Sequence, residues 1–411
     1  MPKIIPHKAL VYGSKYRSHL GELVSPPYDV ISTEYFQKLK SQNEFNSVRL
    51  CLAENSEDSD RYQKMAKLLL DWKEKKVLET LDKPHFYLIE ERFKTASGQH
   101  QRLGFVGLLE VSKFDKKEIL PHEFTLAGPK KDRLELLKTM KAELSQIFFC
   151  YQDQNLALNK IFESKSKTSP FMEGEDPQGV YRKLWLITET SEIETLQKLM
   201  QSQSLLIADG HHRYETAVHF NETENSRNSK YVQGYFTNLD APGFSILPIH
   251  RLFSLPQEMK IEDFISKLKQ NYTLEAFKPG LDFDELTKVQ NSSEVQLLFK
   301  SFHDENVYLL KANKNSADDA EIFSIHKNIF EKILKWDVTQ LAKGIIHYEH
   351  ETEDFKKTFQ KLPRAVGLFL PSTDLKLVMD LAKRGERMPQ KSTFFFPKLA
   401  SGLVNYELGS Y

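Results

Sequence analysis

Apolar positions along the chain recur at two different spacings, and the spacing predicts where helices and strands lie. Residues 60–77 carry apolar side chains at three- and four-residue intervals, which places them on one face of a helix. Two runs rich in β-branched and aromatic residues, 85–93 and 103–111, are separated by the turn residues Thr95 to Gly98. This second pattern predicts a β-hairpin.

Further along, helix and strand patterns alternate through to the C-terminal region. Pro129 can occupy the first turn of a helix, and Leu134, Leu137 and Leu144 would form the apolar side of that helix. The remaining helices are predicted at 191–203, 211–219, 261–271, 321–335, 352–362 and 374–384, and the remaining strands at 205–210, 230–238, 244–251, 295–300, 307–312, 345–350, 365–370 and, as the last one, 392–396. This mixture predicts an α+β (mixed α/β) protein with two lobes, an N-terminal lobe over residues 1–255 and a C-terminal α/β lobe over residues 256–411.

Charge and composition exclude several classes of protein. Lys plus Arg and Asp plus Glu both number 57 in a chain of 411 residues, so no net positive charge exists to hold a nucleic-acid backbone. The cysteines, Cys51 and Cys150, are too few for a disulfide framework or a thiolate metal site. No apolar run reaches the ~20 residues of a membrane span, and the N-terminus lacks the pattern of a secretory signal. We therefore expect a cytoplasmic protein that binds neither nucleic acid nor membrane.

The junction near residue 209 carries the clearest candidate chemistry. A buried strand ends at Asp209-Gly-His-His-Arg213, and a helix pattern follows at once. The backbone N–H groups of the first helical turn, the helix dipole and the Arg213 guanidinium together favour an anion, most naturally a phosphate. The alternative is structural, because an Asp before a helix is often only an N-cap and adjacent histidines can be surface residues.

Two further segments carry candidate residues. Pro121-His-Glu123 follows a short strand, and a carboxylate at such an edge can accept a proton from a substrate hydroxyl. Lys391, Ser392 and Thr393 could bind a carboxylate or phosphate, although such a run is more often a solvated loop. His211 and His212 are consecutive and diverge by ~100° on a helix, so they do not form a metal-binding pair, and no metal ligand is identified.

These segments lie within a set of motifs that resembles a known bacterial family from end to end. The resemblance rests on Val24–Ser32, Asn46–Leu50, Asp60–Tyr62, Leu120–Pro129, Ala208–Ala217 and Pro389–Pro397. By these blocks the chain is identified as a member of the domain-of-unknown-function 1015 family. That family name implies little chemistry.

A more distant resemblance implies more. A Pro-His-Glu block, a later Asp-Gly-His-His-Arg block and a terminal Pro-x-Lys-x-Thr block also occur in this order in SerK-like free serine kinases of the ParB/sulfiredoxin superfamily. The resemblance implies a nucleotide-binding core of that superfamily, with Glu123 as base on the acceptor hydroxyl. Gly210, His211, His212 and Arg213 would hold the nucleotide phosphates, and Asp209 would position the acceptor or its metal. Lys391, Ser392 and Thr393 would hold the substrate.

The expected function is therefore that of a small-molecule kinase. ADP or ATP with Mg²⁺ would donate a phosphoryl group to a hydroxyl, with free L-serine, giving O-phosphoserine, as the candidate acceptor. One alternative is a ParB-like nucleotide-binding regulatory module with little or no turnover, and another is a phosphate-binding protein without turnover. The acceptor, the donor nucleotide and the oligomeric state are left open by the sequence. The three blocks are far apart in the chain, so we expect the C-terminal segment to fold back and place Lys391 or Thr393 opposite Arg213 in a cleft between the lobes.

Overall fold

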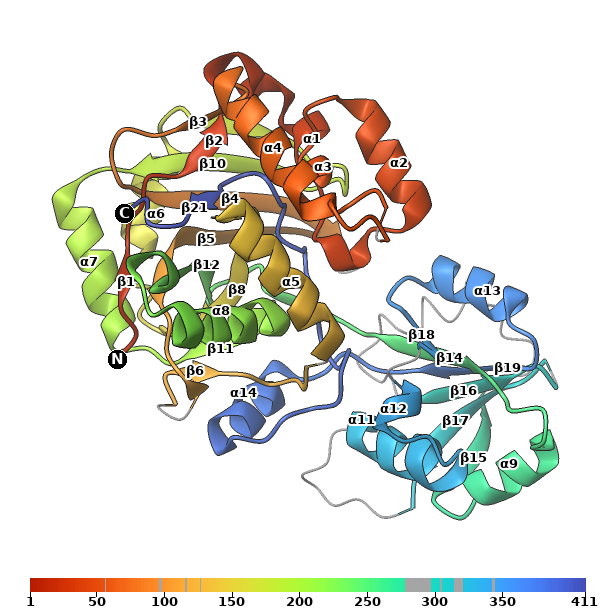
Figure 1. Ribbon diagram of the computed structural model, residues 1–411. Coiled ribbons are helices and arrows are strands. Elements are labelled where there is room, and N and C mark those ends of the chain that lie inside the picture. The colour runs from red at the N-terminus through yellow and green to blue at the C-terminus, as the bar shows by residue number, and fades with distance from the viewer. Residues whose placement is uncertain are drawn as a thin grey trace. The chain divides into compact units, whose positions relative to one another are not determined.

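The computed structural model describes residues 1–55, 57–95, 98–114, 117–125, 127–277, 297–303, 305–313, 321–341 and 344–411. The chain divides into two compact units (Figure 1). Unit 1 comprises residues 1–121, 125–244 and 397–411, and unit 2 comprises residues 122–124 and 245–396. Residues 245–396 of unit 2 are thus inserted between two segments of unit 1, and residues 122–124 lie between two others. These units are defined by compactness and not by independent folding, so the assignment of lobes to 1–255 and 256–411 stays a prediction.

A mixed nine-stranded sheet forms the centre of unit 1. Its strands are β1 (Ile4–Ile5), β4 (Phe86–Thr95), β5 (Gly98–Glu110), β6 (Ile119–Leu120), β8 (Ile147–Tyr151), β9 (Met172–Glu175), β10 (Tyr181–Ile187), β11 (Leu205–Asp209) and β12 (Tyr231–Asn238). Their order is β6-β11-β8-β12-β5-β4-β10-β9, with β1 paired to β5. The pairs β6/β11 and β8/β12 are parallel and the other pairs are antiparallel. Two small pairs complete unit 1: β2 (Leu10–Tyr12) with β3 (Leu78–Thr80), and β7 (Ala142–Glu143) with β21 (Tyr406–Glu407).

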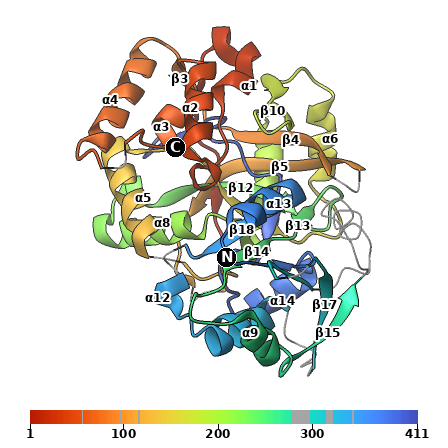
Figure 2. The same cartoon turned by 90° about the vertical axis from the view of Figure 1, so that its right-hand side faces the viewer.

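The helices of unit 1 pack around this sheet. They are α1 (Leu20–Leu23), α2 (Thr33–Gln42), α3 (Val48–Cys51), α4 (Arg61–Glu74), α5 (Ala127–Met140), α6 (Asn159–Ser166), α7 (Thr190–Gln201) and α8 (His211–Glu224). Helices α5 and α8 lie side by side in both views (Figures 1 and 2). Phe162 of α6, Leu196 of α7 and Tyr214 of α8 share one buried cluster with Phe105 and Phe149 of the sheet. Each such side chain contributes about 1.5–3 kcal/mol by burial, which fixes α8 on the sheet.

Unit 2 contains a six-stranded antiparallel sheet. Its strands are β14 (His250–Ser254), β15 (Tyr272–Phe277), β16 (Leu298–Ser301), β17 (Val307–Ala312), β18 (Ile346–Glu349) and β19 (Ala365–Phe369), in the order β15-β17-β16-β19-β14-β18. A separate pair joins β13 (Ser245–Leu247) to β20 (Phe394–Phe396). The helices are α9 (Ile261–Leu268), α11 (Glu321–Ser324), a π-helix over Ile325–Ile333, α12 (Val338–Leu341), α13 (Thr352–Lys361) and α14 (Leu375–Arg384). The ring centroids of Phe355 and Phe369 lie 3.9 Å apart in the core of unit 2.

Mixed α/β architecture was predicted by the sequence and is confirmed. The hairpin is formed by β4 and β5, although residues 96–97 of its turn lie outside the described residues. The predicted strand 295–300 corresponds to β16, and its residues 295–296 also lie outside the described residues. Within the described residues, every helix is too short or too polar to span a lipid bilayer.

Three local predictions were wrong. Leu144 is not part of the helix after Pro129, because α5 ends at Met140 and Lys141 turns the chain with a φ of 51°. The predicted strand 244–251 is two strands, β13 and β14, separated at Pro248, which cannot donate a ladder hydrogen bond. The last strand is β21 and not the one near residue 396.

Candidate active site

The turn between β11 and α8 is built around a glycine. Gly210 has a φ of 93° and a ψ of 27°, a left-handed conformation that a residue with a side chain adopts only at a cost. A Cβ atom at this position would also lie 3.0 Å from Nη2 of Arg213. The tight turn brings Asp209, at the end of the strand, beside Arg213 in the first turn of the helix. Arg213 Nη2 donates to Asp209 Oδ2 at 2.9 Å, and Nη1 donates to the Gln146 carbonyl at 2.6 Å.

A second cation reaches the same carboxylate from the C-terminal segment. Lys398 Nζ donates to Asp209 Oδ1 at 2.5 Å, and only 8% of the Lys398 side chain is exposed. Asp209 therefore lies between two cations, Lys398 on one oxygen and Arg213 on the other. The three side chains carry a net charge of +1 at the N-terminal end of α8, where the helix dipole adds positive potential. This arrangement favours binding of an anion.

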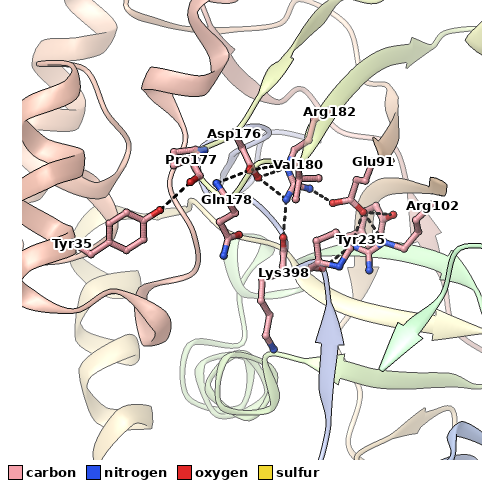
Figure 3. A network of polar contacts seen from close by, with 11 residues as sticks. Tyr35, Glu91, Arg102, Asp176, Pro177, Gln178, Val180, Arg182, Tyr235 and Lys398 are labelled. Atoms are coloured by element: carbon pink, nitrogen blue, oxygen red, sulfur yellow. Dashed lines mark hydrogen bonds and ion pairs between the residues drawn. The ribbon is translucent and has the colours of Figure 1, made fainter. Parts of the chain in front are cut away.

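Lys398 is held by a buried network of charges (Figure 3). Arg182 Nη2 donates to the Lys398 carbonyl at 2.8 Å, and Arg102 Nη2 donates to the Pro397 carbonyl at 2.8 Å. Both guanidinium groups pair with the fully buried carboxylate of Glu91. Burial lowers the pKa of Arg182 to about 10, so this side chain stays charged at neutral pH. The backbone of the returning segment is thus fixed by charged donors from β5 and β10.

Two further hydrogen bonds extend the network. Arg182 Nε donates to Asp176 Oδ2 at 2.8 Å, and the Tyr235 hydroxyl donates to Glu91 Oε2 at 3.1 Å. Two arginines and two carboxylates give no net charge. A balanced and hydrogen-bonded network of this kind can remain buried, whereas removing one partner would leave an unpaired charge.

The two histidines of the Asp-Gly-His-His-Arg run lie in the first turn of α8. His211 is 7% exposed and His212 is half-buried. The Thr216 hydroxyl donates to the His212 carbonyl at 2.7 Å, one turn further along the helix. Their assignment to phosphate binding stays a prediction.

In unit 2 the structure brings the Pro-His-Glu block and the Lys-Ser-Thr block together. Glu123 Oε1 accepts hydrogen bonds from the backbone N–H of Ser392 at 3.0 Å and of Thr393 at 3.2 Å. The Thr393 hydroxyl donates to the same oxygen at 3.2 Å and lies 2.8 Å from His122 Nε2. One carboxylate oxygen of Glu123 thus joins residues 122–124 to residues 391–393.

Lys391 differs from its two neighbours. Its side chain is exposed, whereas Ser392 and Thr393 are 5% and 7% exposed. The Lys391 backbone has a φ of 56°, and its carbonyl accepts a hydrogen bond from Arg251 Nη2 at 2.7 Å. Arg251 is buried and fixes this turn, while the Lys391 side chain is exposed. The role of Lys391 in holding a substrate stays a prediction.

The predicted residues therefore form two groups, one in each unit. Asp209, Arg213 and Lys398 lie together in unit 1, and Glu123 and Thr393 lie together in unit 2. Convergence of the two groups in one cleft stays a prediction. Sequence reasoning missed Lys398, which directly follows the block Pro389–Pro397.

Comparisons with solved structures give distant similarities. A variant of free serine kinase in complex with AMP is 12% identical, covers 71% of this chain and 88% of that chain, and has a TM-score of 0.38. A conserved hypothetical protein from Pyrococcus furiosus is 15% identical, with coverages of 71% and 92% and a TM-score of 0.37. SbnI with C-terminal truncation from Staphylococcus aureus is 11% identical, with coverages of 72% and 85% and a TM-score of 0.36.

No curated protein matches the sequence. One family model does match, over residues 4–339, and it is described as "Protein of unknown function (DUF1015)". The match covers most of the chain and agrees with the family identified from the sequence blocks. The chain therefore belongs to the DUF1015 family.

Proposed function

We propose that the protein is a small-molecule phosphotransferase that moves a phosphoryl group from ADP or ATP to a hydroxyl, with free L-serine as the candidate acceptor. Its core would be of the ParB/sulfiredoxin type, with the nucleotide phosphates at the start of α8. The proposal combines the resemblance of the three sequence blocks to SerK-like kinases with the charges around Asp209. Phosphoryl transfer depends largely on positioning and on stabilisation of charge, which is what such a site can supply.

The pair of cations on Asp209 is the observation that carries the proposal. Lys398 and Arg213 each lie within 3 Å of the carboxylate, and both are largely buried. A phosphate could accept hydrogen bonds from both, while Asp209 keeps the two side chains aligned. Arg213 offers a planar, always charged donor, and Lys398 offers a compact point charge. The backbone N–H groups of His211 and His212 belong to the same helical turn and would add to the phosphate site.

Glu123 would accept the proton of the acceptor hydroxyl as a general base. Its contact with Thr393 and Ser392 positions the carboxylate, and these two residues with Lys391 would bind the acceptor. Lys391 would meet a carboxylate of the substrate through its exposed ammonium group. In this role Glu123 must act through one oxygen while the other keeps residues 391–393 in place.

Mg²⁺ would enter with the nucleotide as part of the co-substrate. This ion usually keeps several waters and is bound through substrate phosphates with one or two carboxylates. In the part of the chain that the structure describes, no group of three or more His, Cys, Asp or Glu residues could hold a metal ion. Asp209 is the candidate carboxylate for the ion, and each of its oxygens is hydrogen-bonded to a cation.

Phosphorus NMR tests the proposal. The full chain is incubated with ADP or ATP, Mg²⁺ and L-serine, and a new phosphomonoester signal is expected. The signal should be lost in Lys398→Met and kept in Lys40→Met, which removes a lysine paired with Glu54 at 2.6 Å elsewhere in unit 1. Absence of nucleotide binding in the folded wild-type protein would contradict the proposal.

A second candidate function is favoured by the contacts of Glu123. Three hydrogen bonds to one oxygen suit a residue that joins two segments as much as one that transfers protons. The protein would then be a ParB-like nucleotide-binding regulatory module with little or no turnover. Nucleotide binding without a phosphomonoester signal, over a wide pool of hydroxyl compounds, would support this candidate over the first.

A further inference from the structure

A cavity lies in unit 1 beside α5 and the start of α8, and none of the sequence motifs predicted it. Residues of α5, β7 and α8 line it, together with Tyr28 and Ser401. The cavity has a volume of about 70 Å³. One water needs about 10–15 Å³ on this measure and takes about 30 Å³ of liquid, so the space holds about 5–7 waters, or a ligand of about 8–11 non-hydrogen atoms.

Two arginines, Arg133 and Arg213, lie in its wall. Arg133 pairs with Asp132 through Nε at 2.9 Å and Nη2 at 2.5 Å, donates through Nη1 to the Cys51 carbonyl at 3.2 Å, and lies 4.0 Å from the ring centre of Tyr28. Arg213 is held by Gln146 and Asp209, as described above. A guanidinium has five N–H bonds. At least two on each arginine have no partner within the described residues, so both side chains are oriented and can still donate.

Both positive charges act on the same groups around the cavity. Burial raises the pKa of Tyr28; Arg133 and Arg213 oppose this rise, and the carboxylates of Asp29 and Asp209 add to it. Burial likewise raises the pKa of Cys51 to about 12, again opposed by the two arginines. Tyr28, Cys51 and both arginines line the same cavity.

The remaining charges leave this space positive. Asp132 balances Arg133, but Asp209 is shared by Arg213 and Lys398. Glu143 also lines the cavity, and burial raises its pKa to about 8, so it is largely neutral at neutral pH. Arg133 and Arg213 are therefore the charged side chains that line the cavity, and they favour a ligand with a single negative charge.

Apart from Tyr28, Glu143, Ser145, Thr216 and Ser401, the rest of the wall is apolar. Leu136, Leu137 and Met140 contribute from α5, and Leu144, Ile147 and Val232 contribute from the opposite side. A polar molecule such as serine would leave these side chains without apolar contact. A phosphate group would fill about half of the available space by itself, whereas a carboxylate leaves room for a hydrocarbon body.

We propose that this cavity binds a small carboxylate with an apolar body, with the carboxylate on Arg133 and Arg213 and the hydrocarbon against α5. An ammonium group next to the carboxylate would be repelled by the two guanidinium groups, which selects against free amino acids. The site goes beyond the proposed phosphoryl transfer, since its ligand is neither the nucleotide nor the hydroxyl acceptor. Arg213 borders both this cavity and the phosphate site, so a bound carboxylate would reduce the charge available to a nucleotide.

The test uses hexanoate and phenylacetate as probes, whose sizes fall within the expected range, and hexanamide as the neutral counterpart. Calorimetry and ligand-observed NMR on the full chain should show that both carboxylates bind, and that hexanamide binds at least ~10-fold more weakly because it lacks the charge. Equal binding of hexanoate and hexanamide, or no binding of either carboxylate, would overturn the proposal.

Two variants locate the site. Leu136→Trp fills the cavity without changing a charge and should abolish hexanoate binding, whereas Leu70→Trp on the exposed face of α4 should not. Arg133→Met should weaken hexanoate binding ~10-fold or more, whereas Arg92→Met, at an exposed arginine paired with Glu90, should leave it unchanged.

Adenosine tests the alternative occupant of this cavity, which is the base of the nucleotide. Binding of adenosine that is lost in Leu136→Trp, with hexanoate binding kept, would assign the cavity to the nucleoside and overturn the carboxylate proposal. Phosphoryl transfer is measured separately, by the phosphomonoester signal in phosphorus NMR. A protein that binds hexanoate as expected and transfers no phosphate would contradict only the proposed function.

Discussion

Replacing Lys398 by methionine gives the sharpest test of the phosphate site. The substitution keeps most of the side-chain volume and removes one of the two cations on Asp209. Arg213 still pairs with Asp209, so the carboxylate is not left alone. The loss of stability should therefore be about 1–2 kcal/mol, below the ~3–5 kcal/mol that follows when a buried charge loses its only partner.

The effect on nucleotide binding should be larger. A hydrogen bond between an ammonium group and a phosphate contributes about 1.5–3 kcal/mol, so ADP should bind about 10- to 150-fold more weakly to Lys398→Met. At an ADP concentration of 100 times the wild-type Kd, bound nucleotide stabilises the wild-type protein by about 2.7 kcal/mol. By the same relation the gain falls to about 0.3–1.4 kcal/mol in the variant.

Urea unfolding with and without ADP measures the free energy of unfolding and the stabilisation by bound ADP in one series. Calorimetry gives the affinity for ADP directly. Lys40→Met serves as the matched control, because its partner Glu54 is remote in sequence from the site and neither side chain belongs to the proposed machinery. Higher salt should weaken wild-type binding more than variant binding, since one charge contact is missing in the variant. A folded Lys398→Met protein with unchanged ADP affinity would refute the assignment of Lys398 to the phosphate site.

Three further outcomes are expected. Glu123→Gln should lower turnover ~10²–10⁴-fold with nearly unchanged nucleotide affinity, measured by phosphorus NMR and calorimetry; unfolding of this variant would indicate a structural role instead. Gly210→Ala should destabilise the protein by at least ~1 kcal/mol in urea unfolding, because a φ of 93° is unfavourable for alanine; unchanged stability would contradict the left-handed turn. Burial raises the pKa of the Glu143 carboxyl to about 8, so the folded protein holds this proton more tightly than the unfolded chain does. The free energy of unfolding should therefore fall as the pH rises from about 5 to about 8. In Glu143→Gln, urea unfolding should show a smaller decrease over the same pH range.

The junction at Asp209 could be predicted because its signals are local. A run of apolar residues, a glycine and a helical pattern follow one another, and these alone specify β11, the turn at Gly210 and α8. The end of α5 carried no such signal. Lys141 adopts a left-handed conformation although it is neither Gly nor Pro, so the sequence pattern predicted a helix that continued to Leu144.

Lys398 could not be assigned from local pattern. Its contact with Asp209 depends on the return of residues 397–411 to unit 1, and on the buried arginines Arg102 and Arg182 that hold its backbone. Those two arginines lie on strands whose alternation looks ordinary in the sequence. The cavity beside α5 was missed for the same reason, because its walls come from segments that only tertiary packing brings together.

The inserted position of unit 2 imposes an order on the synthesis of the protein. The ribosome must produce residues 245–396 after most of unit 1 has emerged, which takes about 10–30 s at ordinary rates. During that interval β7 lacks its partner strand β21, Arg102 and Arg182 lack the carbonyls of Pro397 and Lys398, and Asp209 has only one of its two cations. The nascent protein is therefore unable to assemble its full anion site until the final residues leave the ribosome, so a chain that stops early carries the motif without the charge that completes it.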